Sequence, residues 1–599
     1  MLIQCDKFYQ SGGENHYTEW KHYLGDPGRS HYSELSEFTS KNIKSLKVAW
    51  EYESKDYGQM QMNPIVIDTL LYGVSSALRV FALDARSGEE VWVFGDTLKT
   101  LFSTSRGVSY WESGNDKRIF YTKGADLWAL NAHTGQPIPS FGKGGKIDLR
   151  SGLHASAQDK FVISSTPGTI YKNLIIMPIR LSEGVGAAPG DVMAFDVITG
   201  ELAWSFHTLP RPGETGIETW GDPNISESPI VGAANNWAGM ALDQKREILF
   251  VPTGSASPDF YGALRPGKNL YSNCLLALNA NTGKLLWHYQ FIHHDLWDRD
   301  LPAPPNLITV NHGGKKIAAV AQVTKQGYVF VFDRETGQPL FDIEEVAVPE
   351  SELPGEQTWP TQPVPVKPAN FARQSDKLTT EDISPFAPNR DSLIALFEQS
   401  DKRHFAPPSL EPALLLPGYD GGAEWGGAAA DPDKGILYIN SNEMAWFLQM
   451  RTNDDKGEKL TAVERIYRQN CAVCHMTNRS GSRASGYPSL LAIKTRLSEK
   501  NIHNIIMQGK GMMPGFPQIP EKDRQQLVNF LIDKSDIKGV KEISQTNSIK
   551  PHLPFQHMGY TKFLDQNSLP AISDTYILSL TRKEKHLRTQ FQHHLCDEE

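Results

Sequence analysis

Short apolar stretches separated by polar turns recur along the first 450 residues of the chain. Five of them share one pattern: an apolar strand, Asp or Asn, a short turn, Ser or Thr followed by Gly, and in most copies a second strand that ends in an aromatic residue. The Asx side chain caps the turn and the Gly supplies a positive φ, so each copy predicts a β-hairpin. The copies lie at residues 80–92, 127–135, 193–204, 276–287 and 331–337.

The spacing of the hairpins predicts the architecture. A period of roughly 45–80 residues with several short strands in each unit is typical of a β-propeller, whose blades cover one another's strand edges. A β-sandwich with coincidental turns is the alternative, and five copies of one turn pattern argue against it. Residues 46–52 alternate between polar and apolar side chains, which predicts a further strand before the first copy.

The length, net charge and apolar runs of the chain limit the classes of protein to which it can belong. A chain of 599 residues is too long for one ordinary core, so we expect at least two domains. The net charge of -9 argues against nucleic-acid binding. The sequence has no apolar run long enough for a transmembrane helix, and its N-terminus lacks the basic and apolar segments of a signal peptide.

The chain has five cysteines, and two of them, Cys471 and Cys474, form a Cys-x-x-Cys-His motif with His475. Two thiols at this spacing add to the vinyl groups of haem, and the adjacent His ligates the iron. Zinc is the alternative, but no second Cys/His pair follows at finger spacing. Met513, just before a proline, is the expected sixth ligand, with Met512 as its rival.

The surroundings of this motif predict a small all-α domain. Residues 461–470 and 521–533 have the apolar spacing of helices, and the whole segment 455–537 resembles a class I cytochrome c. Covalent attachment of haem c takes place outside the bacterial cytoplasm, so we expect a periplasmic protein.

The segment 293–305 has an unusual composition: three carboxylates, two imidazoles, one indole and three prolines within thirteen residues. Asp and His favour hydrogen-bonded loops, and proline stops a strand ladder. The segment is either a solvated turn or a loop that holds a carboxylate rigidly against a ligand.

The repeat, with a Trp at the end of its second strand, resembles the blades of the eight-bladed quinoprotein alcohol and sugar dehydrogenases over residues 17–452. The loop His-His-Asp-Leu-Trp-Asp-x-Asp-Leu-Pro-Ala resembles that of the glucose and quinate dehydrogenase branch. The resemblance implies an all-β eight-bladed-type propeller with pyrroloquinoline quinone (PQQ) and Ca²⁺ or Mg²⁺ at its axis. It also implies oxidation of a sugar or alcohol hydroxyl, with glucose or another aldose or polyol as substrate.

The resemblance assigns cofactor contacts residue by residue. Arg106 would pair with a PQQ carboxylate, Trp237 would stack on the cofactor face, and Trp425 would lie close to it. Lys325 would bind the quinone oxygens and assist catalysis.

The same resemblance assigns the ligands of the cation and the catalytic base. Glu183 and Asp298 would bind the cation, and Ser255 stands where the alcohol dehydrogenases carry an Asn ligand. Asp298 would remove the proton of the substrate hydroxyl, with Asp300 as the rival base, and the hydride would pass to the quinone. Electrons would then reach the haem and leave for an external cytochrome or quinone.

Beyond the cytochrome segment, residues 550–571 again resemble the propeller, whereas residues 572–599 form a charged, His-rich tail without strand alternation. From this tail we expect a truncated, incomplete ring. The alternatives are therefore a catalytically inactive propeller, or a scaffold similar to outer-membrane assembly lipoproteins.

Overall fold

The computed structural model describes residues 17–572, apart from 18, 57–58, 96–103, 453–460, 476–477, 482–486, 511–512, 514, 517–518, 533–554, 558–560 and 566–570. The expected tail at 572–599 therefore lies outside the described residues, except for Ile572.

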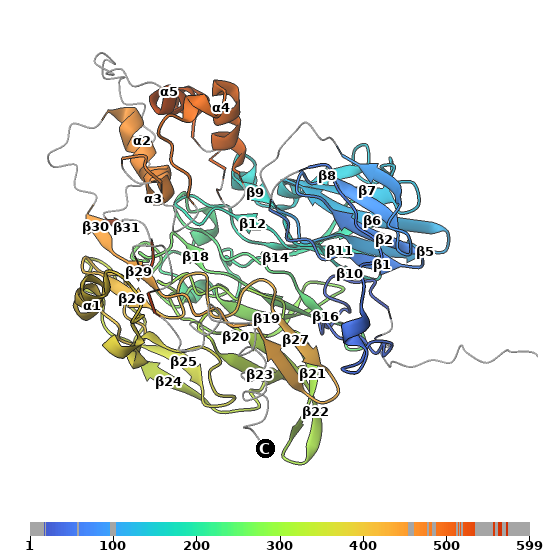
Figure 1. Ribbon diagram of the computed structural model, residues 1–599, viewed down its shortest axis with the longest axis horizontal. Helices are drawn as coiled ribbons and strands as arrows, with labels where there is room; N and C mark the ends of the chain where they lie inside the picture. Colours follow the sequence, from blue (N-terminus) through green and yellow to red (C-terminus); the bar gives the residue numbers. More distant parts are fainter. Residues whose placement is uncertain are drawn as a thin grey trace, which may run out of the picture.

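Four antiparallel sheets of four strands form the first half of the chain (Figure 1). They contain β1 (Ile65–Ile67), β2 (Leu70–Val74), β3 (Val80–Asp84) and β4 (Glu90–Phe94); β5 (Ser109–Ser113), β6 (Asp116–Lys123), β7 (Asp126–Asn131) and β8 (Lys146–Asp148); β10 (Thr169–Tyr171), β11 (Leu174–Met177), β13 (Val192–Asp196) and β14 (Leu202–Phe206); and β16 (Ala241–Asp243), β17 (Ile248–Pro252), β19 (Cys274–Asn279) and β20 (Leu285–Gln290).

The later sheets are smaller. Two have three strands: β21 (Asn306–His312), β22 (Lys315–Val323) and β23 (Val329–Asp333); and β26 (Ala413–Leu415), β29 (Trp446–Leu448) and β32 (Thr561–Lys562). The strand pairs are β9 (Val162–Ile163) with β12 (Arg180–Leu181), β15 (Gly232–Ala233) with β18 (Ala256–Ser257), β24 (Ile343–Ala347) with β25 (Thr361–Pro365), β27 (Ala428–Asp431) with β28 (Ile436–Ile439), and β30 (Met450–Thr452) with β31 (Phe555–His557).

The five predicted Asx turns are present. Asp84 Oδ1 accepts from the main-chain nitrogens of Arg86 at 2.9 Å and Ser87 at 3.1 Å. The same bonds form at the other four copies, and the turn glycines have φ between 69° and 80°. These bonds satisfy main-chain donors that the hairpin leaves unpaired, which explains the constant spacing.

The Trp of an outer strand packs on the turn of the next sheet, although it lies within the strand and not at its end as the sequence pattern predicted. A Cβ on the turn glycine would overlap the indole in three such contacts: Trp92 on Gly135, Trp204 on Gly283 and Trp287 on Gly337. Trp50 covers Gly88 in the same way.

The strand predicted at residues 46–52, to which Trp50 belongs, is wrong, because this segment is irregular. A strand needs a hydrogen-bonded neighbour. Leu46 and Val48 are instead 50% and 75% exposed.

An N-terminal segment, residues 20–30, crosses the first strands of several sheets. The main-chain bonds involve Val66 of β1 (2.9 Å), Leu242 of β16 (2.8 Å), Leu307 of β21 (2.9 Å) and Ala430 of β27 (2.7 Å). Arg29 is buried within it and donates to the Met240 carbonyl at 2.7 Å. This segment thus ties early and late parts of the chain together around the inner strands.

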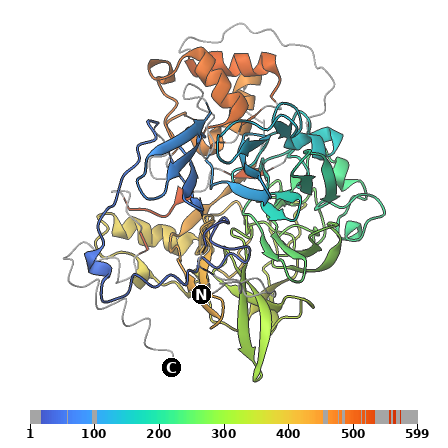
Figure 2. The ribbon, with the colours of Figure 1, turned by 90° about the vertical axis from the view of Figure 1, so that its right-hand side faces the viewer.

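The helical part lies at one side of the sheets (Figures 1 and 2) and contains α2 (Ala462–Asn470), α3 (Ala472–His475), η8 (Ile493–Thr495), α4 (Glu499–Gln508) and α5 (Glu521–Ile532). Thr461 and Glu464 form a capping box at the start of α2. This helical segment is inserted between β30 and β31, which pair with each other, so both of its connections leave from one place.

The remaining helices are short: α1 (Arg390–Gln399), η1 (Ile43–Ser45), η2 (Leu149–Gly152), η3 (Ala155–Ala157), η4 (Ile217–Thr219), η5 (Ile225–Glu227), η6 (Ser375–Lys377) and η7 (Thr380–Asp382). None of the helices in the described part of the chain has the length and apolar character that crossing a membrane requires.

Candidate active site

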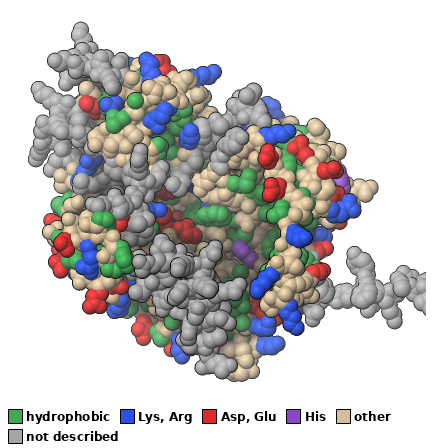
Figure 3. Space-filling view, viewed as in Figure 1, with side chains coloured by type: hydrophobic (Ala, Val, Ile, Leu, Met, Phe, Trp, Pro, Cys, Tyr) green, Lys and Arg blue, Asp and Glu red, His purple; other side chains and the backbone are tan. Residues whose placement is uncertain are grey.

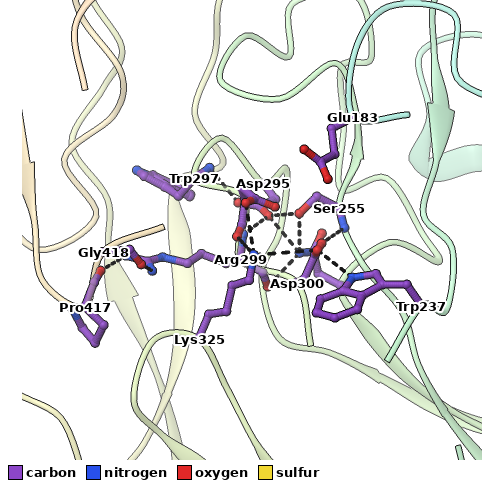
Figure 4. Close-up of polar contacts among 12 residues, drawn as sticks. Glu183, Trp237, Ser255, Asp295, Trp297, Arg299, Asp300, Lys325, Pro417 and Gly418 are labelled. Carbon is purple, nitrogen blue, oxygen red and sulfur yellow. Dashed lines mark hydrogen bonds and ion pairs between the residues drawn. The ribbon is translucent and has the colours of Figure 1, made fainter. Parts of the chain in front are cut away.

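The acidic loop after β20 is organised from within by Asp295. Its carboxylate accepts from the main-chain nitrogens of Trp297 at 2.8 Å and Arg299 at 2.7 Å. It also accepts from Asn273 Nδ2 at 2.9 Å and from the Ser255 hydroxyl. The loop is therefore not a solvated turn, because its supporting side chains are buried and bonded (Figure 4).

Asp298 and Lys325 meet at the front of this loop. Lys325, in the turn between β22 and β23, donates its Nζ to the Asp298 carboxylate at 3.1 Å and to the Asp298 carbonyl at 2.9 Å. The Asp298 side chain is 21% exposed, whereas that of Lys325 is 8% exposed. The carboxylate can thus meet a ligand while the ammonium stays shielded.

Asp300 occupies a more constrained position. Its Oδ2 accepts from Trp237 Nε1 at 2.8 Å and its Oδ1 from the Ser255 nitrogen at 2.5 Å. Lys325 Nζ lies 3.7 Å away. Asp300 therefore fixes the edge of the Trp237 indole and joins it to the loop.

The charges of this site are strongly coupled. Burial raises the pKa of Asp298 well above its usual range; Lys325 opposes this, and Asp300, Glu183 and Asp295 add to it. Burial lowers the pKa of Lys325, but the Asp298 and Asp300 carboxylates outweigh burial and raise it. A shielded ammonium thus faces a carboxylate whose proton affinity is increased, as suits a general base.

Arg106 contacts two indoles. Its guanidinium is 5.3 Å from the Trp237 ring centroid and 5.0 Å from that of Trp425. Nη1 donates to Thr166 Oγ1 at 2.7 Å and Ser165 Oγ at 3.2 Å, whereas the buried Nε has no partner among the described residues. Burial lowers the Arg106 pKa to about 10. An orphaned cationic donor beside aromatic rings fits a flat, carboxylate-bearing ligand such as PQQ.

Ser255 lies against the carboxylates of Asp295 and Asp300, and Glu183 lies on the same side, beyond Ser255 (Figure 4). The Glu183 side chain is 63% exposed, and its carboxylate is 4.0 Å from the guanidinium of Arg180. Ser255 uses its hydroxyl on Asp295 and its nitrogen on Asp300.

Asp259 is a site residue that sequence reasoning missed. It follows β18, and burial together with repulsion from Asp298 and Glu183 raises its pKa well above the usual range. The signal in the sequence is the Ser-Pro-Asp that follows Ser255 and Ala256, but only the fold brings this carboxylate to the others.

Acidic side chains gather in the hollow in the middle of this face (Figure 3). Among the described residues, no three His, Cys, Asp or Glu side chains are placed to coordinate one ion. The chemistry of the donors nevertheless fits a hard cation, because the buried carboxylates of Asp298 and Asp259 repel each other and Glu183 stands beside them.

The haem motif lies on α3. Cys471 is buried, and His475 Nδ1 bonds to the Pro488 carbonyl at 2.8 Å, which leaves Nε2 as the atom for iron. Met513 packs partly buried against the same core. This donor set fits haem c. Cys474 lies on α3 without a described side chain, and Met512 lies outside the described residues.

Comparison with protein families shows which family the chain belongs to. A family model described as "Glucose/ethanol/alcohol dehydrogenase, beta-propeller domain" of PQQ proteins matches residues 20–490. The chain belongs to the PQQ dehydrogenase β-propeller family. A second model, "Cytochrome C oxidase, cbb3-type, subunit III", matches residues 458–531, so the expected cytochrome c segment is confirmed as a family match.

Two curated relatives are similar to this chain over most of its length. Quinoprotein glucose dehydrogenase of Escherichia coli is 32% identical over 460 residues, which cover 70% of this chain and 55% of the relative. Quinate/shikimate dehydrogenase (quinone) of Acinetobacter baylyi is 31% identical over 492 residues, covering 74% of this chain and 59% of the relative. The chain thus spans little more than half the length of these relatives.

Solved structures of PQQ dehydrogenases share the fold. Quinohemoprotein alcohol dehydrogenase ADHIIG from Pseudomonas putida has a TM-score of 0.55 at 21% identity, covering 74% of this chain and 59% of that one. The enzyme from Comamonas testosteroni has a TM-score of 0.53 at 19% identity, covering 86% of this chain and 95% of that one. The predicted β-propeller with a small helical domain is confirmed.

Proposed function

We propose that this chain oxidises a sugar or polyol hydroxyl with PQQ and passes the electrons to its own haem c. The observation that carries this proposal is the Asp298–Lys325 pair at 3.1 Å, which the Asp300–Trp237 bond joins to Arg106. The Arg106 guanidinium is buried next to two indoles, and its Nε has no partner among the described residues. The spans matched by the propeller and cytochrome families support it.

Different residues would bind PQQ, the cation and the haem. Arg106 would bind a PQQ carboxylate, with Trp237 and Trp425 against the ring system. Glu183 and Asp298, with Ser255 nearby, would hold Ca²⁺ or Mg²⁺, and Asp259 adds negative charge to that place. Cys471 and Cys474 would carry the haem, with His475 and Met513 on the iron.

PQQ, when bound, supplies the acceptor for the hydride of the substrate carbon. Asp298 accepts the proton of the substrate hydroxyl, and its raised pKa suits that role. Lys325 stays cationic, since its pKa is raised, and would donate to the quinone oxygens of bound PQQ. Asp295 and Asp300 hold the base and the Trp237 indole in place.

The substrate class and compartment follow from the relatives. Proteins named glucose, quinate/shikimate and glycerol dehydrogenases match this chain, and all three names denote polyhydroxylated substrates. We propose a periplasmic protein with an external cytochrome or quinone as final acceptor, because haem c is attached outside the cytoplasm. A catalytically inactive propeller is the competing proposal.

The test is reduction of the haem by substrate. The purified haem protein is loaded with PQQ and Ca²⁺ and mixed with glucose, quinate or glycerol, and the visible spectrum is followed. We expect reduced haem with at least one substrate, and none without PQQ. If only a chemical reductant reduces the haem, the inactive propeller is the better description.

A further inference from the structure

The segment of residues 417–427, here called the strap, contacts three cationic residues of the site. Its first residues bond to Arg299, its middle lies against Lys325, and Trp425 near its end lies on Arg106. Arg299 and Lys325 come from separate loops, and Arg106 precedes β5. One short segment thus connects the catalytic loop with the cofactor pocket.

Arg299 holds the start of the strap. It stands between Asp298 and Asp300 in the sequence, yet its side chain points away from Asp300 toward Pro417 and Gly418 (Figure 4). Nη1 donates to the Gly418 carbonyl at 2.8 Å and Nη2 to the Pro417 carbonyl at 2.7 Å. A planar guanidinium can bond two adjacent carbonyls at once, which an ammonium cannot do with the same geometry.

The other end of Arg299 is fixed to the loop. Its nitrogen donates to Asp295 at 2.7 Å, and its carbonyl accepts from Asn273 Nδ2 at 3.0 Å. The residue is 6% exposed, and burial lowers its pKa. A buried guanidinium whose hydrogen bonds go to carbonyls is costly, so this link fixes the strap rather than neutralising the site.

The middle of the strap leaves no room for side chains. Gly422 donates its nitrogen to the Lys325 carbonyl at 2.7 Å. Gly421 has a φ of 94°, and a Cβ there would overlap the Lys325 side chain. The strap therefore forms the wall behind Lys325, in a conformation that only glycine adopts without strain.

The strap places Trp425 in the proposed cofactor pocket. The Trp425 and Trp237 rings both lie against the Arg106 guanidinium, at 5.0 and 5.3 Å. Trp237 is fixed by its bond to Asp300, whereas Trp425 depends on the course of the strap. Both aromatic walls are thus tied to the acidic loop, one through Asp300 and the other through Arg299.

We propose that Arg299 is a positioning residue for the reaction: it fastens the strap to the acidic loop and so sets Trp425 against the bound cofactor and the wall behind Lys325. This inference rests on the proposed function. It also explains the sequence Asp298-Arg299-Asp300. Asp298 bonds to Lys325, Arg299 bonds to the strap and Asp300 bonds to Trp237.

The test compares Arg299→Met and Arg299→Lys with a matched control, Arg118→Met. Arg118, on β6, is similarly buried, at 4% exposure, and also donates to carbonyls, those of Val197 at 2.8 Å and Ile198 at 3.2 Å; it differs in pairing with Asp116 at 2.6 Å. Amide hydrogen exchange of residues 417–427 is measured on the haem protein without PQQ. PQQ affinity is then measured by quenching of tryptophan fluorescence.

We expect faster exchange of the strap and an about tenfold weaker PQQ affinity in both Arg299 variants, and neither change in Arg118→Met. In a double-mutant cycle, Trp425→Phe with Arg299→Lys should lose no more affinity than the larger single change, because both act through one contact. Unchanged exchange of the strap in the Arg299 variants, or additive losses in the cycle, would overturn the inference. If the wild-type protein bound no PQQ, the proposed function would fail and the positioning role with it.

Discussion

The ammonium of Lys325 bonds to both the carboxylate and the carbonyl of Asp298, at 3.1 and 2.9 Å. Asp298 has a φ of 54°, in the left-handed region that an Asp tolerates only when its surroundings hold it there. The two bonds from one ammonium provide such a hold. Lys325 therefore orients the base as well as supplying positive charge.

Lys325→Gln should lower turnover by about a hundredfold or more, because a neutral amide cannot stabilise developing negative charge on the quinone oxygens. The measurement is the steady-state rate with an artificial electron acceptor. Lys172→Gln serves as the control, since Lys172 forms an exposed pair with Glu247 at 2.7 Å. Equal rates for wild type and Lys325→Gln would contradict the role of Lys325.

The affinity for PQQ should depend on the ionisation of Glu424. Burial, followed by the Asp420 carboxylate, raises the pKa of Glu424 to about 7. Below that pH the side chain is neutral; above it, the ionised carboxylate repels the carboxylates of PQQ. We therefore expect the dissociation constant to increase as pH rises through 7.

Glu424→Gln should remove this step, since an amide does not titrate. Titrations of PQQ from pH 6 to 8, at constant ionic strength, compare the two proteins. A step near pH 7 that persists in Glu424→Gln would assign it to another group.

The rear of the acidic loop is held by a buried ion pair. His294 Nε2 lies 2.9 Å from Glu356, and the two side chains are 3% and 1% exposed. Burial raises the pKa of Glu356, but His294, Arg265 and the bond from the Gly262 nitrogen together outweigh burial and lower the pKa, so these contacts stabilise the fold at neutral pH and less as pH falls. Glu356→Gln should cost about 1–3 kcal/mol of unfolding free energy, because one carboxylate oxygen becomes an amide nitrogen, which leaves either His294 or the Gly262 nitrogen without its buried acceptor.

Denaturant titration measures this loss. His293 and Glu345 form the matched control pair: they are 3.4 Å apart, and Glu345 is 49% exposed. Glu345→Gln should cost at most about 1 kcal/mol. Similar losses for the two variants would show that burial of the Glu356 pair has no special effect.

The sixth ligand of the haem can be tested by a pair of methionine variants. Met513→Ala should remove a thioether from the iron and lower the reduction potential of the haem, since Met ligation raises it. Met512→Ala should leave the potential unchanged. Redox titration followed by visible absorbance distinguishes them, and the opposite pattern would make Met512 the ligand.

Local features of the fold could be predicted from the sequence. The Asx caps at Asp84 and Asn279 and the glycines that follow them depend on neighbouring residues alone. The helix after Thr461 begins with a capping box that is visible in the sequence. Such features need no knowledge of the distant chain.

Features that depend on distant contacts could not be predicted. The sheet of β26, β29 and β32 joins residues from both sides of the helical insertion. Asp259 and Glu356 are ordinary loop acids in the sequence, and only folding brings them to the acidic loop. The strand expected at residues 46–52 had the right alternation, but alternation does not supply a neighbour.

The most direct test of the role of Asp298 is single-turnover reduction of the haem in the Asp298→Asn variant. The protein is loaded with PQQ and Ca²⁺, and the haem spectrum is followed after rapid mixing with the substrate that reduces the wild type. We expect that Asp298→Asn still binds PQQ but reduces its haem at least about a thousandfold more slowly, whereas Asp300→Asn retains the larger part of the rate. If the Asp298→Asn variant reduced its haem at the wild-type rate, and the Asp300→Asn variant lost that rate instead, the assignment of Asp298 as the base would be contradicted.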